Sequence, residues 1–357
     1  MNDAGLDHEL MKRFRQGMVI PAMPLALDEQ RKFQEPNQRA LARYYIDAGA
    51  GGIAVGVHTT QFAIRDPRFN LFEKVLSSVS SSIDDWSKTR DVKIFKISGI
   101  CGKTDQASRE AEFARSCGYH AGLLSLSAFH DASEGEMLEH CRRIAALMPI
   151  IGFYLQPAIG GRVLSCSFWR QFAGIKNVIG IKIAPFNRYQ TLDVIRGVCD
   201  AGKDAEIPLY TGNDDNIVID LLTEYRIMTS DGEKHVRIKG GLLGHWAVWT
   251  RNAVQMLNQI HQLAKDDNIP GNMLTLAAHI TDCNAAFFDA ANQYAGCIPG
   301  IHDVLRRQGL FPGTWCLDAR EVLSPGQAKE IDRVYKVYPD LNDDAFVKTN
   351  LDKWFER

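Results

Sequence analysis

The sequence predicts an α/β protein, a (β/α)8 TIM barrel with a C-terminal helical extension. Two observations lead to this prediction: eight short apolar segments recur over roughly 240 residues, and helical patterns alternate with them. Strands that alternate with helices are typical of parallel βαβ units. Eight units fit a barrel better than an open doubly wound sheet. No Gly-x-Gly-x-x-Gly motif follows the first segment, which further disfavours a dinucleotide-binding fold.

The predicted strands are short apolar runs, each followed by a helical pattern. They cover residues 17–27, 51–56, 93–99, 122–127, 149–157, 178–184, 207–211 and 241–248. Between the last two strands, residues 224–239 predict a β-hairpin, because Asp231-Gly232 is flanked by strand-like residues.

Helical patterns in the first part of the chain are found at residues 38–48, 105–117 and 134–147. Beyond residue 250 they dominate, at residues 252–265, 273–295, 301–308 and 325–337. We therefore predict a barrel domain at 1–250, with the hairpin insertion near 224–239, and a helical extension at 251–357. The acidic residues Asp340, Asp343 and Asp344 are interpreted as a solvated surface rather than a metal site.

The composition is that of an ordinary globular protein, with 45% hydrophobic and 24% charged residues among 357. A net charge of −2 gives no electrostatic basis for binding nucleic acid or an anionic membrane. No apolar run approaches the length of a membrane span, and residues 1–17 lack the apolar core of a signal peptide. We therefore expect a cytoplasmic protein without nucleic-acid or membrane partners. The eight scattered cysteines predict buried free thiols.

The sixth predicted strand carries one lysine in an apolar run. With the period of two that a strand imposes, Lys182 shares a face with Gly180 and Ala184, while three isoleucines point the other way. The small neighbours leave space for a carbonyl substrate to reach the amine. A desolvated lysine loses affinity for its proton and becomes a nucleophile. A structural, ion-paired lysine is the alternative interpretation.

The fifth predicted strand carries a tyrosine. Alternation places Tyr154 on the same face as Gly152, and Phe153 on the opposite face, which we assign to the helix layer. Tyr154 is then expected to point inward, one strand away from Lys182. A phenol beside an amine suits Schiff-base chemistry, which moves protons as water leaves and as the enamine forms. A buried tyrosine with one backbone hydrogen bond is the alternative.

These residues resemble a known signature. Tyr154, Pro157, the pair Gly160-Gly161 and Gly180-Ile181-Lys182 are similar to the Tyr-x-x-Pro…Gly-x-Lys pattern of the dihydrodipicolinate synthase / N-acetylneuraminate lyase family. The tyrosine and the lysine lie 28 residues apart (182 − 154), which fits that pattern.

Further segments match the family in the right order. Residues 211–215, which include Gly212, resemble its Ser-Gly-Asp-Asp turn, and Gly240-Gly241 resembles its glycine-rich entry to strand eight. Residues 297–300 are similar to the start of its helical tail, so the resemblance covers about residue 15 to about residue 335.

The resemblance implies a class I aldolase that forms a Schiff base between Lys182 and a 2-oxo acid, usually pyruvate. Tyr154 would be the proton shuttle. No metal or organic cofactor would be required, because the protonated imine is itself the electron sink. The family also implies a homo-oligomer, a tetramer or a dimer, and an aldehyde is a candidate second partner.

The segment after strand two departs from the family pattern Gly-Thr-Thr-Gly-Glu, whose amides and hydroxyls hold the substrate carboxylate. Aligned without a gap, Val57 and His58 take the hydroxyl positions. With a one-residue slip, Thr59 and Thr60 take them instead, and both alignments stay open. His58, Thr59 and Thr60 are therefore candidate carboxylate-binding residues. A histidine that caps the strand end is the other interpretation of His58.

Two more loops depart from the synthases. Phe129 and His130 stand where the synthases carry a tyrosine pair, and His130 is a candidate proton shuttle near neutral pH. Ile159 stands in place of an arginine that binds a second carboxylate, with Arg162 three residues on. This disfavours authentic dihydrodipicolinate synthase and favours a different acceptor, aromatic or sugar-like.

Aromatic residues near strand ends are candidates for the walls of such a pocket, with core packing as the alternative. They are Phe186, Trp246 and Trp249. We assign Lys182 and Tyr154 to catalysis, and His58, Thr59, Thr60, His130, Gly212 and Trp246 to substrate binding.

The predicted function is a Schiff-base aldolase or lyase that makes or breaks a carbon–carbon bond next to a 2-oxo acid. One alternative is a dehydratase or hydratase-aldolase that uses the same imine on a 2-oxo-3-deoxy acid or an arylidene pyruvate. A third hypothesis, of another class, is a non-catalytic protein that binds 2-oxo acids.

Overall fold

The computed structural model describes residues 7–157, 160–266 and 268–356, which form two compact units. Unit 1 consists of Met1–Met18 and Phe95–Leu242, and unit 2 of Val19–Ile94 and Leu243–Arg357. Both units are discontinuous in sequence, so they do not correspond to the predicted division at residue 250, which stays a prediction.

Strands and helices alternate along the chain as predicted. The strands are β1 (Val19–Pro21), β2 (Gly52–Val55), β3 (Phe95–Ile100), β4 (Ala121–Leu124), β5 (Ile150–Leu155), β6 (Val178–Ala184), β7 (Leu209–Thr211), β8 (Glu224–Thr229) and β9 (Gly232–Leu243). The helices that follow β1 to β7 and β9 are α2 (Glu35–Ala48), α3 (Phe72–Arg90), α4 (Thr104–Ser116), α5 (Glu134–Leu147), α6 (Cys166–Ala173), α7 (Arg188–Asp200), α8 (Ile217–Leu222) and α9 (Thr250–Leu263). The remaining helices are α1 (His8–Gln16), α10 (Asn272–Phe288), α11 (Cys297–Arg307), α12 (Gln327–Val337) and α13 (Asp344–Phe355).

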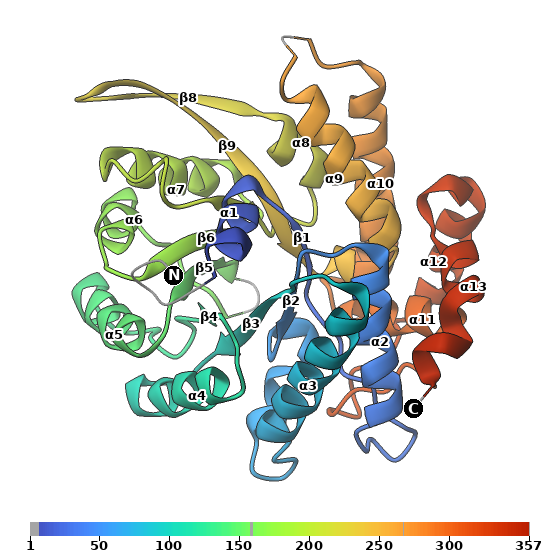
Figure 1. The fold of residues 1–357 in the computed structure, drawn as a ribbon. Coiled ribbons are helices and arrows are strands. Elements are labelled where there is room, and N and C mark those ends of the chain that lie inside the picture. The colour runs from blue at the N-terminus through green and yellow to red at the C-terminus, as the bar shows by residue number, and fades with distance from the viewer. Residues whose placement is uncertain (1–6, 158–159, 267, 357) are drawn as a thin grey trace. The chain divides into compact units, whose positions relative to one another are not determined.

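Unit 1 is built on a parallel sheet with the strand order β9-β7-β6-β5-β4-β3. Helices α4 to α7 lie along one face of these strands (Figure 1). Parallel strands covered in this way are buried on both faces. Accordingly, every residue of β3, β4, β5 and β6 is buried.

The register of the sheet assigns each side chain to a face. Lys182 of β6 pairs with Phe153 of β5 and with Tyr210 of β7, and register partners of neighbouring strands point the same way. We call this side the lysine face and the opposite side the helix face. Phe14 of α1 covers one end of the lysine face, with its ring 4.7 Å from that of Phe95 and 4.8 Å from that of Tyr210.

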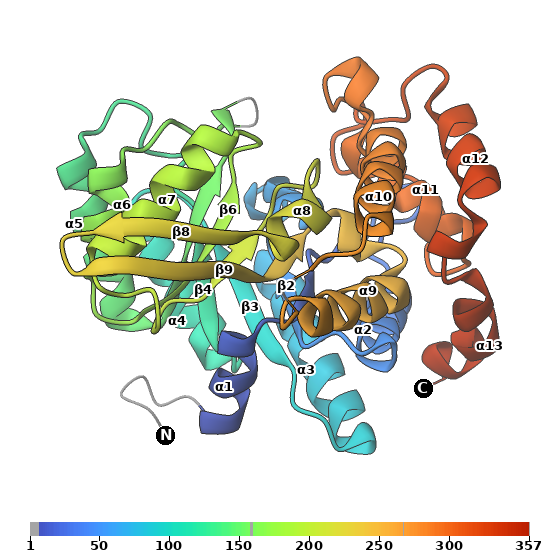
Figure 2. The ribbon, with the colours of Figure 1, turned by 90° about the horizontal axis from the view of Figure 1, so that it is seen from above.

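The predicted hairpin is present. Strands β8 and β9 pair antiparallel from Glu224↔Arg237 to Thr229↔Gly232, and they form a long ribbon beside α7 (Figure 2). The predicted bounds of the eighth barrel strand, residues 241–248, are wrong. The hairpin strand continues directly into the barrel as β9, which ends at Leu243, and His245–Ala247 form a 3-10 helix.

Unit 2 contains β1 and β2, joined by a parallel bridge between Ala22 and Ala54, together with helices α2, α3 and α9 to α13. Helix α2 packs against both α3 and α13 (Figure 1). Helix α10 ends at Phe288 rather than at the predicted residue 295, because Asp289 adopts a left-handed backbone with φ 59°. None of the helices in the described part of the chain is long and apolar enough to cross a membrane.

The prediction of a solvated acidic tail is wrong for Asp343, which is 4% exposed. Its carboxylate accepts hydrogen bonds from the hydroxyl of Tyr44 at 2.7 Å, from the amide of Arg251 at 2.9 Å and from the side chain of Gln308 at 2.8 Å. A buried carboxylate needs such donors to offset the loss of hydration. Asp343 therefore ties the segment before α13 to α2, α9 and α11.

Candidate active site

Lys182 lies near the carboxyl end of β6, where parallel α/β proteins bind their ligands. Its side chain is 8% exposed, and its Nζ lies 4.5 Å from the centroid of the Phe153 ring. The turn after β7 comes very close: a β-carbon on Gly212 would lie 2.4 Å from Cε of Lys182 and 2.8 Å from Cβ of Ala184. Glycine is therefore required at position 212 for the lysine to keep this conformation.

Burial changes the acid–base behaviour of this lysine. Desolvation lowers the pKa of Lys182 to about 8, and the nearby negative charge of Asp214 opposes part of that shift. At pH 7 about a tenth of such amines are neutral, compared with fewer than about one in a thousand for an exposed lysine. Lys182 thus provides a usable fraction of the nucleophilic form near neutral pH.

The predicted inward orientation of Tyr154 is wrong. Tyr154 pairs in register with Ile183 and points to the helix face, where its ring lies 5.1 Å from that of Trp169 on α6. Its hydroxyl accepts a hydrogen bond from the amide of Leu164 at 3.1 Å. Phe153, predicted to face the helices, instead stands on the lysine face. The catalytic role of Tyr154 stays an untested prediction, but its phenol is directed away from the amine.

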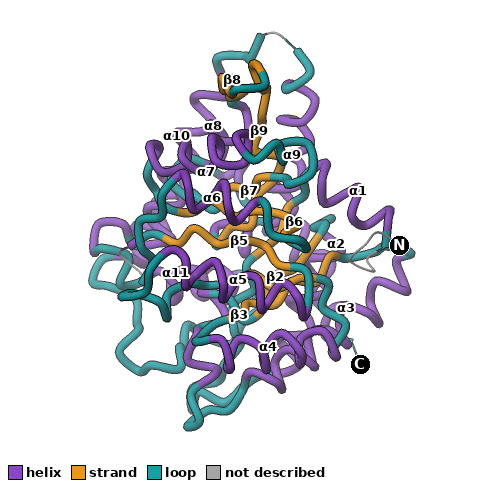
Figure 3. The backbone as a smooth tube through the Cα atoms, turned by 90° about the vertical axis from the view of Figure 1, so that its left-hand side faces the viewer, coloured by secondary structure: helices purple, strands orange, loops and turns teal. Residues whose placement is uncertain are grey.

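A change in pairing register accompanies this difference. Ile150 pairs with Val178, but Ile151 already pairs with Gly180, so Ile179 is an extra residue in β6 (strands β5 and β6, Figure 3). The neighbours of Gly152 confirm the assignment of faces. A β-carbon on Gly152 would lie 2.6 Å from the ring of Phe172 in α6, so the even-numbered positions of β5 face the helices.

The turn that carries Gly212 is held by a buried carboxylate, Asp220 of α8. Asp220 is fully buried and accepts hydrogen bonds from Thr211 at 2.7 Å, Asn213 at 2.9 Å and Asn216 at 2.8 Å. Arg188, the first residue of α7, donates to the same carboxylate at 2.7 Å. Four donors to one buried carboxylate restrict the movement of the turn. They thereby also hold in place the residues of the turn that surround Lys182.

The same network reaches the loop after β6. The side-chain oxygen of Asn213 accepts a hydrogen bond from the amide of Phe186 at 3.0 Å, and Phe186 adopts a left-handed backbone with φ 52°. A bulky residue in this conformation is uncommon and is held by its surroundings. Phe186 therefore has a fixed position beyond the end of β6, close in sequence to Lys182.

The loop after β4 contains Phe129 and His130. Phe129 is buried, with Nζ of Lys103 4.4 Å from its ring centroid, whereas the side chain of His130 is exposed. Arg162 donates from Nη1 to the backbone carbonyls of Phe129, His130 and Ala132, at 2.9, 3.2 and 2.7 Å. The loops after β4 and β5 are thus joined by one guanidinium. Ile159, which we compared with the synthase arginine, lies outside the described residues.

Three predicted carboxylate-binding residues form a 3-10 helix in unit 2, His58–Thr60. The hydroxyl of Thr59 donates to the carbonyl of Ala22 at 2.7 Å, and that of Thr60 donates to the carbonyl of Met23 at 2.6 Å. Both threonines are buried, while His58 is half-buried. The threonine hydroxyl protons are used by the backbone around β1, and the role of these residues in substrate binding stays a prediction.

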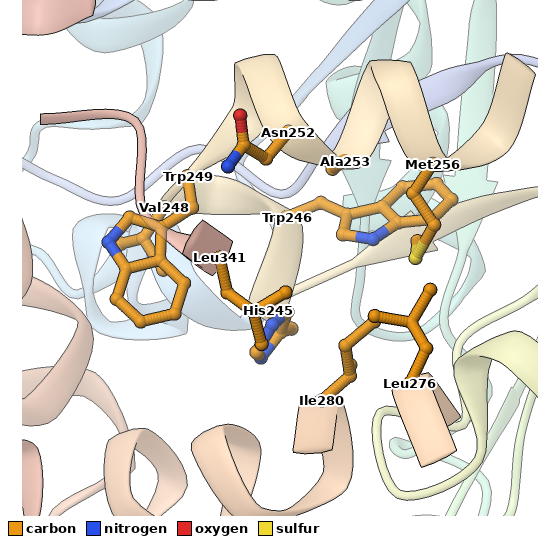
Figure 4. A pocket seen from close by; sticks show the side chains of 10 residues that line it. All are labelled: His245, Trp246, Val248, Trp249, Asn252, Ala253, Met256, Leu276, Ile280 and Leu341. Atoms are coloured by element: carbon orange, nitrogen blue, oxygen red, sulfur yellow. The ribbon is translucent and has the colours of Figure 1, made fainter. Parts of the chain in front are cut away.

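Trp246 also belongs to unit 2, where it lines a largely apolar cavity of about 50 Å³ (Figure 4). Trp249, Met256 and Ile280 line the same cavity, and His245 lies at its side with a pKa that burial lowers to about 4. Apart from Trp249, which was also a candidate pocket-wall residue, none of the described residues that line it is among the other predicted site residues. Core packing, the alternative given for both tryptophans, agrees with their burial.

The structure thus brings together Lys182 and Gly212 of the predicted residues, and it adds Phe153, Asp214 and Asp220. Asp214 lies in the predicted turn motif, but no role was predicted for it. The Asn-Asp-Asp run directly after an apolar strand could have indicated a functional acid there. The sequence indicates nothing about Asp220 except that it is a single acidic residue in an apolar run. In the described part of the chain, no three His, Cys, Asp or Glu residues are close enough together to hold a metal ion.

Known proteins resemble the chain in sequence and in fold. The sequence model of the Dihydrodipicolinate synthetase family matches residues 15–223, which is more than half of the chain. A search of curated proteins finds no match. Among solved structures, dihydrodipicolinate synthase from Oceanobacillus iheyensis has 14% sequence identity and a TM-score of 0.72, covering 93% of this chain and 99% of its own.

Two similar structures are complexes with pyruvate. Chloride-inhibited dihydrodipicolinate synthase from Acinetobacter baumannii has 16% identity and a TM-score of 0.70, covering 90% of this chain and 98% of its own. N-acetylneuraminate lyase from Fusobacterium nucleatum has 16% identity and a TM-score of 0.68, covering 90% of this chain and 97% of its own. These likenesses confirm the predicted (β/α)8 fold with C-terminal helices.

Proposed function

The chain belongs to the dihydrodipicolinate synthetase family, whose members are class I aldolase-type lyases, and we propose that it forms an imine between Lys182 and pyruvate or a related 2-oxo acid. The observation that carries this proposal is the Lys182 amine itself. It is buried near the carboxyl end of a parallel strand, its pKa is lowered to about 8, and glycine and alanine flank it. The pyruvate complexes of two similar structures support the choice of ligand.

The imine makes a 2-oxo acid reactive next to its carbonyl carbon. The amine adds to the ketone and water is lost, and the resulting cationic C=N group accepts the electron pair that a breaking C3–C4 bond releases. The reverse sequence forms that bond with an aldehyde. The proposed activity is therefore carbon–carbon bond cleavage or formation next to a 2-oxo acid.

Authentic dihydrodipicolinate synthesis is not the proposed reaction. Arg162, the arginine nearest in sequence to the position that Ile159 occupies, directs Nη1 to three backbone carbonyls. That nitrogen is engaged in joining two loops and does not suit the binding of a second substrate's carboxylate. A dehydratase or hydratase-aldolase would use the same imine, and product analysis separates it from an aldolase by the release of water instead of pyruvate.

The second candidate is a non-catalytic 2-oxo acid-binding protein. The orientation of Tyr154 favours it, because a phenol on the helix face does not serve the amine as a proton shuttle. Binding of pyruvate without imine formation would support this candidate.

Reductive trapping tests the proposal. The protein is incubated with pyruvate and borohydride, and mass spectrometry locates the added group. We expect one reduced pyruvyl group on the peptide that contains Lys182. Lys182→Met should abolish the label, and the matched control Lys176→Met, six positions earlier in the chain, should keep it. Equal labelling of Lys182→Met and the unaltered protein would refute the imine. A panel of 2-oxo acids then ranks the substrates.

A further inference from the structure

The amine of Lys182 faces an aromatic ring where the family signature leads one to expect a phenol. Phe153 is the register partner of Lys182, and its ring centroid lies 4.5 Å from Nζ. A phenylalanine ring cannot donate or accept the protons that imine chemistry moves. Another group on the lysine face must therefore carry them.

Asp214 stands in the turn that contacts Lys182, and its charge acts on the amine. It lies two residues beyond Gly212, whose backbone is in contact with the Lys182 side chain, and it is itself 6% exposed. The hydrogen bonds of Asp220 to Thr211 and Asn213 hold the segment on which it stands. A buried carboxylate in a fixed turn beside a buried amine is arranged for short-range proton exchange.

Two other ionisable side chains of this region have partners elsewhere. Tyr210, the partner on β7, donates its hydroxyl to the carbonyl of Phe14 at 2.6 Å, and burial raises its pKa well above 10. Asp215, the neighbouring acid, faces Arg188, with 3.6 Å between carboxylate and guanidinium. Asp214 is the charged side chain whose field acts on Lys182.

We propose that Asp214 is the general acid and base for the imine chemistry of Lys182, in place of a tyrosine. This inference rests on the proposed function, because it assigns the proton transfers of that same imine.

The proposed steps are balanced in atoms and charge, because Asp214 later returns the proton that it takes from Lys182. The Asp214 carboxylate takes a proton from the Lys182 ammonium, and the amine so formed adds to the ketone carbon. One N–H proton moves to the ketone oxygen, which gives a neutral carbinolamine. Asp214 then returns its proton to the hydroxyl, the C–O bond breaks, water leaves and the cationic imine forms. The carboxylate finally removes a proton from C3, and the C–H electron pair moves into the C=C bond of a neutral enamine.

The test measures two rates on the full-length protein with pyruvate as the probe. Borohydride trapping across pH reports imine formation, and exchange of the pyruvate methyl protons with D2O, followed by NMR, reports enamine formation. Asp214→Asn should slow both by about 10²-fold at every pH. Asp215→Asn, the matched control at the adjacent acid, should leave both rates within a factor of about two, as expected for a side chain outside the chemistry.

A purely electrostatic role for Asp214 gives the opposite result for trapping. If the carboxylate only holds the proton on Lys182, Asp214→Asn lowers the pKa of the amine further. More amine is then neutral below pH 8, and trapping speeds up. Faster or unchanged trapping in Asp214→Asn therefore overturns this inference while the proposed function stands. No trapping in the unaltered protein overturns the proposed function itself.

A second variant guards against a folding defect in Asp214→Asn. The double variant Phe153→Tyr with Asp214→Asn places a phenol on the lysine face beside the amine, and we expect it to recover at least about tenfold of the lost exchange rate. A loss caused by misfolding would not be restored by one added hydroxyl group on β5. Failure of this rescue in a protein that melts like the unaltered one counts against the assignment.

Discussion

Strands β5 and β6 lie side by side, but they present the two parts of one sequence motif to opposite faces of the sheet. Strand β6 directs Lys182 to the lysine face, among Gly212, Ala184 and Phe153. Strand β5 directs Tyr154 to the helix face, onto Trp169 and the backbone of Leu164. The sequence spacing of the two residues fits the family signature. Spacing along the chain therefore does not fix the face of the sheet on which a side chain emerges.

The surroundings of the two residues also differ in kind. The Lys182 side is built of glycine, a fixed turn and buried acids, which together hold an amine whose pKa is lowered to about 8. The Tyr154 side is an aromatic cluster in which burial raises the pKa of the phenol above its usual value of 10. The first environment suits chemistry, and the second suits packing. Substitutions on the two strands and in the turn after β7 test that contrast.

Removal of the Lys182 amine should have the largest effect on imine formation. Lys182→Met should abolish the borohydride-dependent label, because no other group can form the imine there. The same variant should be more stable than the unaltered protein at pH 7. The pKa of Lys182 is about 8 in the folded protein, below the ordinary lysine value of 10.5, so the fold opposes protonation of a side chain that is protonated when unfolded.

The free-energy cost of burying the protonated amine is fully present below pH 8 and disappears as the pH rises from about 8 to 10.5. At pH 7 its removal should raise the free energy of unfolding by up to about 3 kcal/mol. Chemical denaturation at pH 7 and at pH 10.5 measures this difference. A variant that is less stable at pH 7 would contradict the view that the amine is held in place at the expense of stability.

The addition of a β-carbon to the turn after β7 should have the next largest effect on trapping. Gly212→Ala would place that atom 2.4 Å from Cε of Lys182, so the lysine must move. We expect the trapping rate to fall by about 10²-fold, because a displacement of about 1 Å misaligns the amine. Gly271→Ala is the control, since a β-carbon there meets nothing within 4 Å. Unchanged trapping in Gly212→Ala would show that the turn does not position the lysine.

The pH dependence of trapping is expected to follow the neutral fraction of Lys182. With a pKa of about 8, that fraction falls about fifty-fold from pH 8 to pH 6, and the trapping rate should fall with it. Above pH 9 the rate should level off. A rate that still rises steeply between pH 9 and pH 10 would mean that the amine keeps the pKa of an exposed lysine.

Removal of the Tyr154 hydroxyl should have the smallest effect on chemistry. Because the phenol faces the helices, Tyr154→Phe should change the trapping rate by no more than about twofold. Stability should fall by about 1–2 kcal/mol, since the buried amide of Leu164 loses its acceptor. A 10²-fold loss of trapping would show instead that the phenol reaches the amine in the working protein, and the contrast between the strands would fail.

Much of the fold was predictable because local sequence patterns indicate the type of each helix and strand. Strand β6 and helix α5 have the predicted bounds, and the hairpin of β8 and β9 follows from Asp231-Gly232. The extent of β9 and the end of α10 were missed. The first depends on the hairpin strand running on into the sheet, and the second on the left-handed backbone at Asp289, and the local apolar pattern contains neither.

The amino-acid sequence alone specifies the type and order of the elements and the presence of one lysine among small residues in a buried strand. The tertiary structure decided the face of Tyr154, the burial of Asp343 and the network around Asp220. The physical reason lies in the parallel sheet. Its strands are apolar on both faces, so alternation fixes which residues share a face but leaves open which face carries the site, and only pairing with β6 decides it.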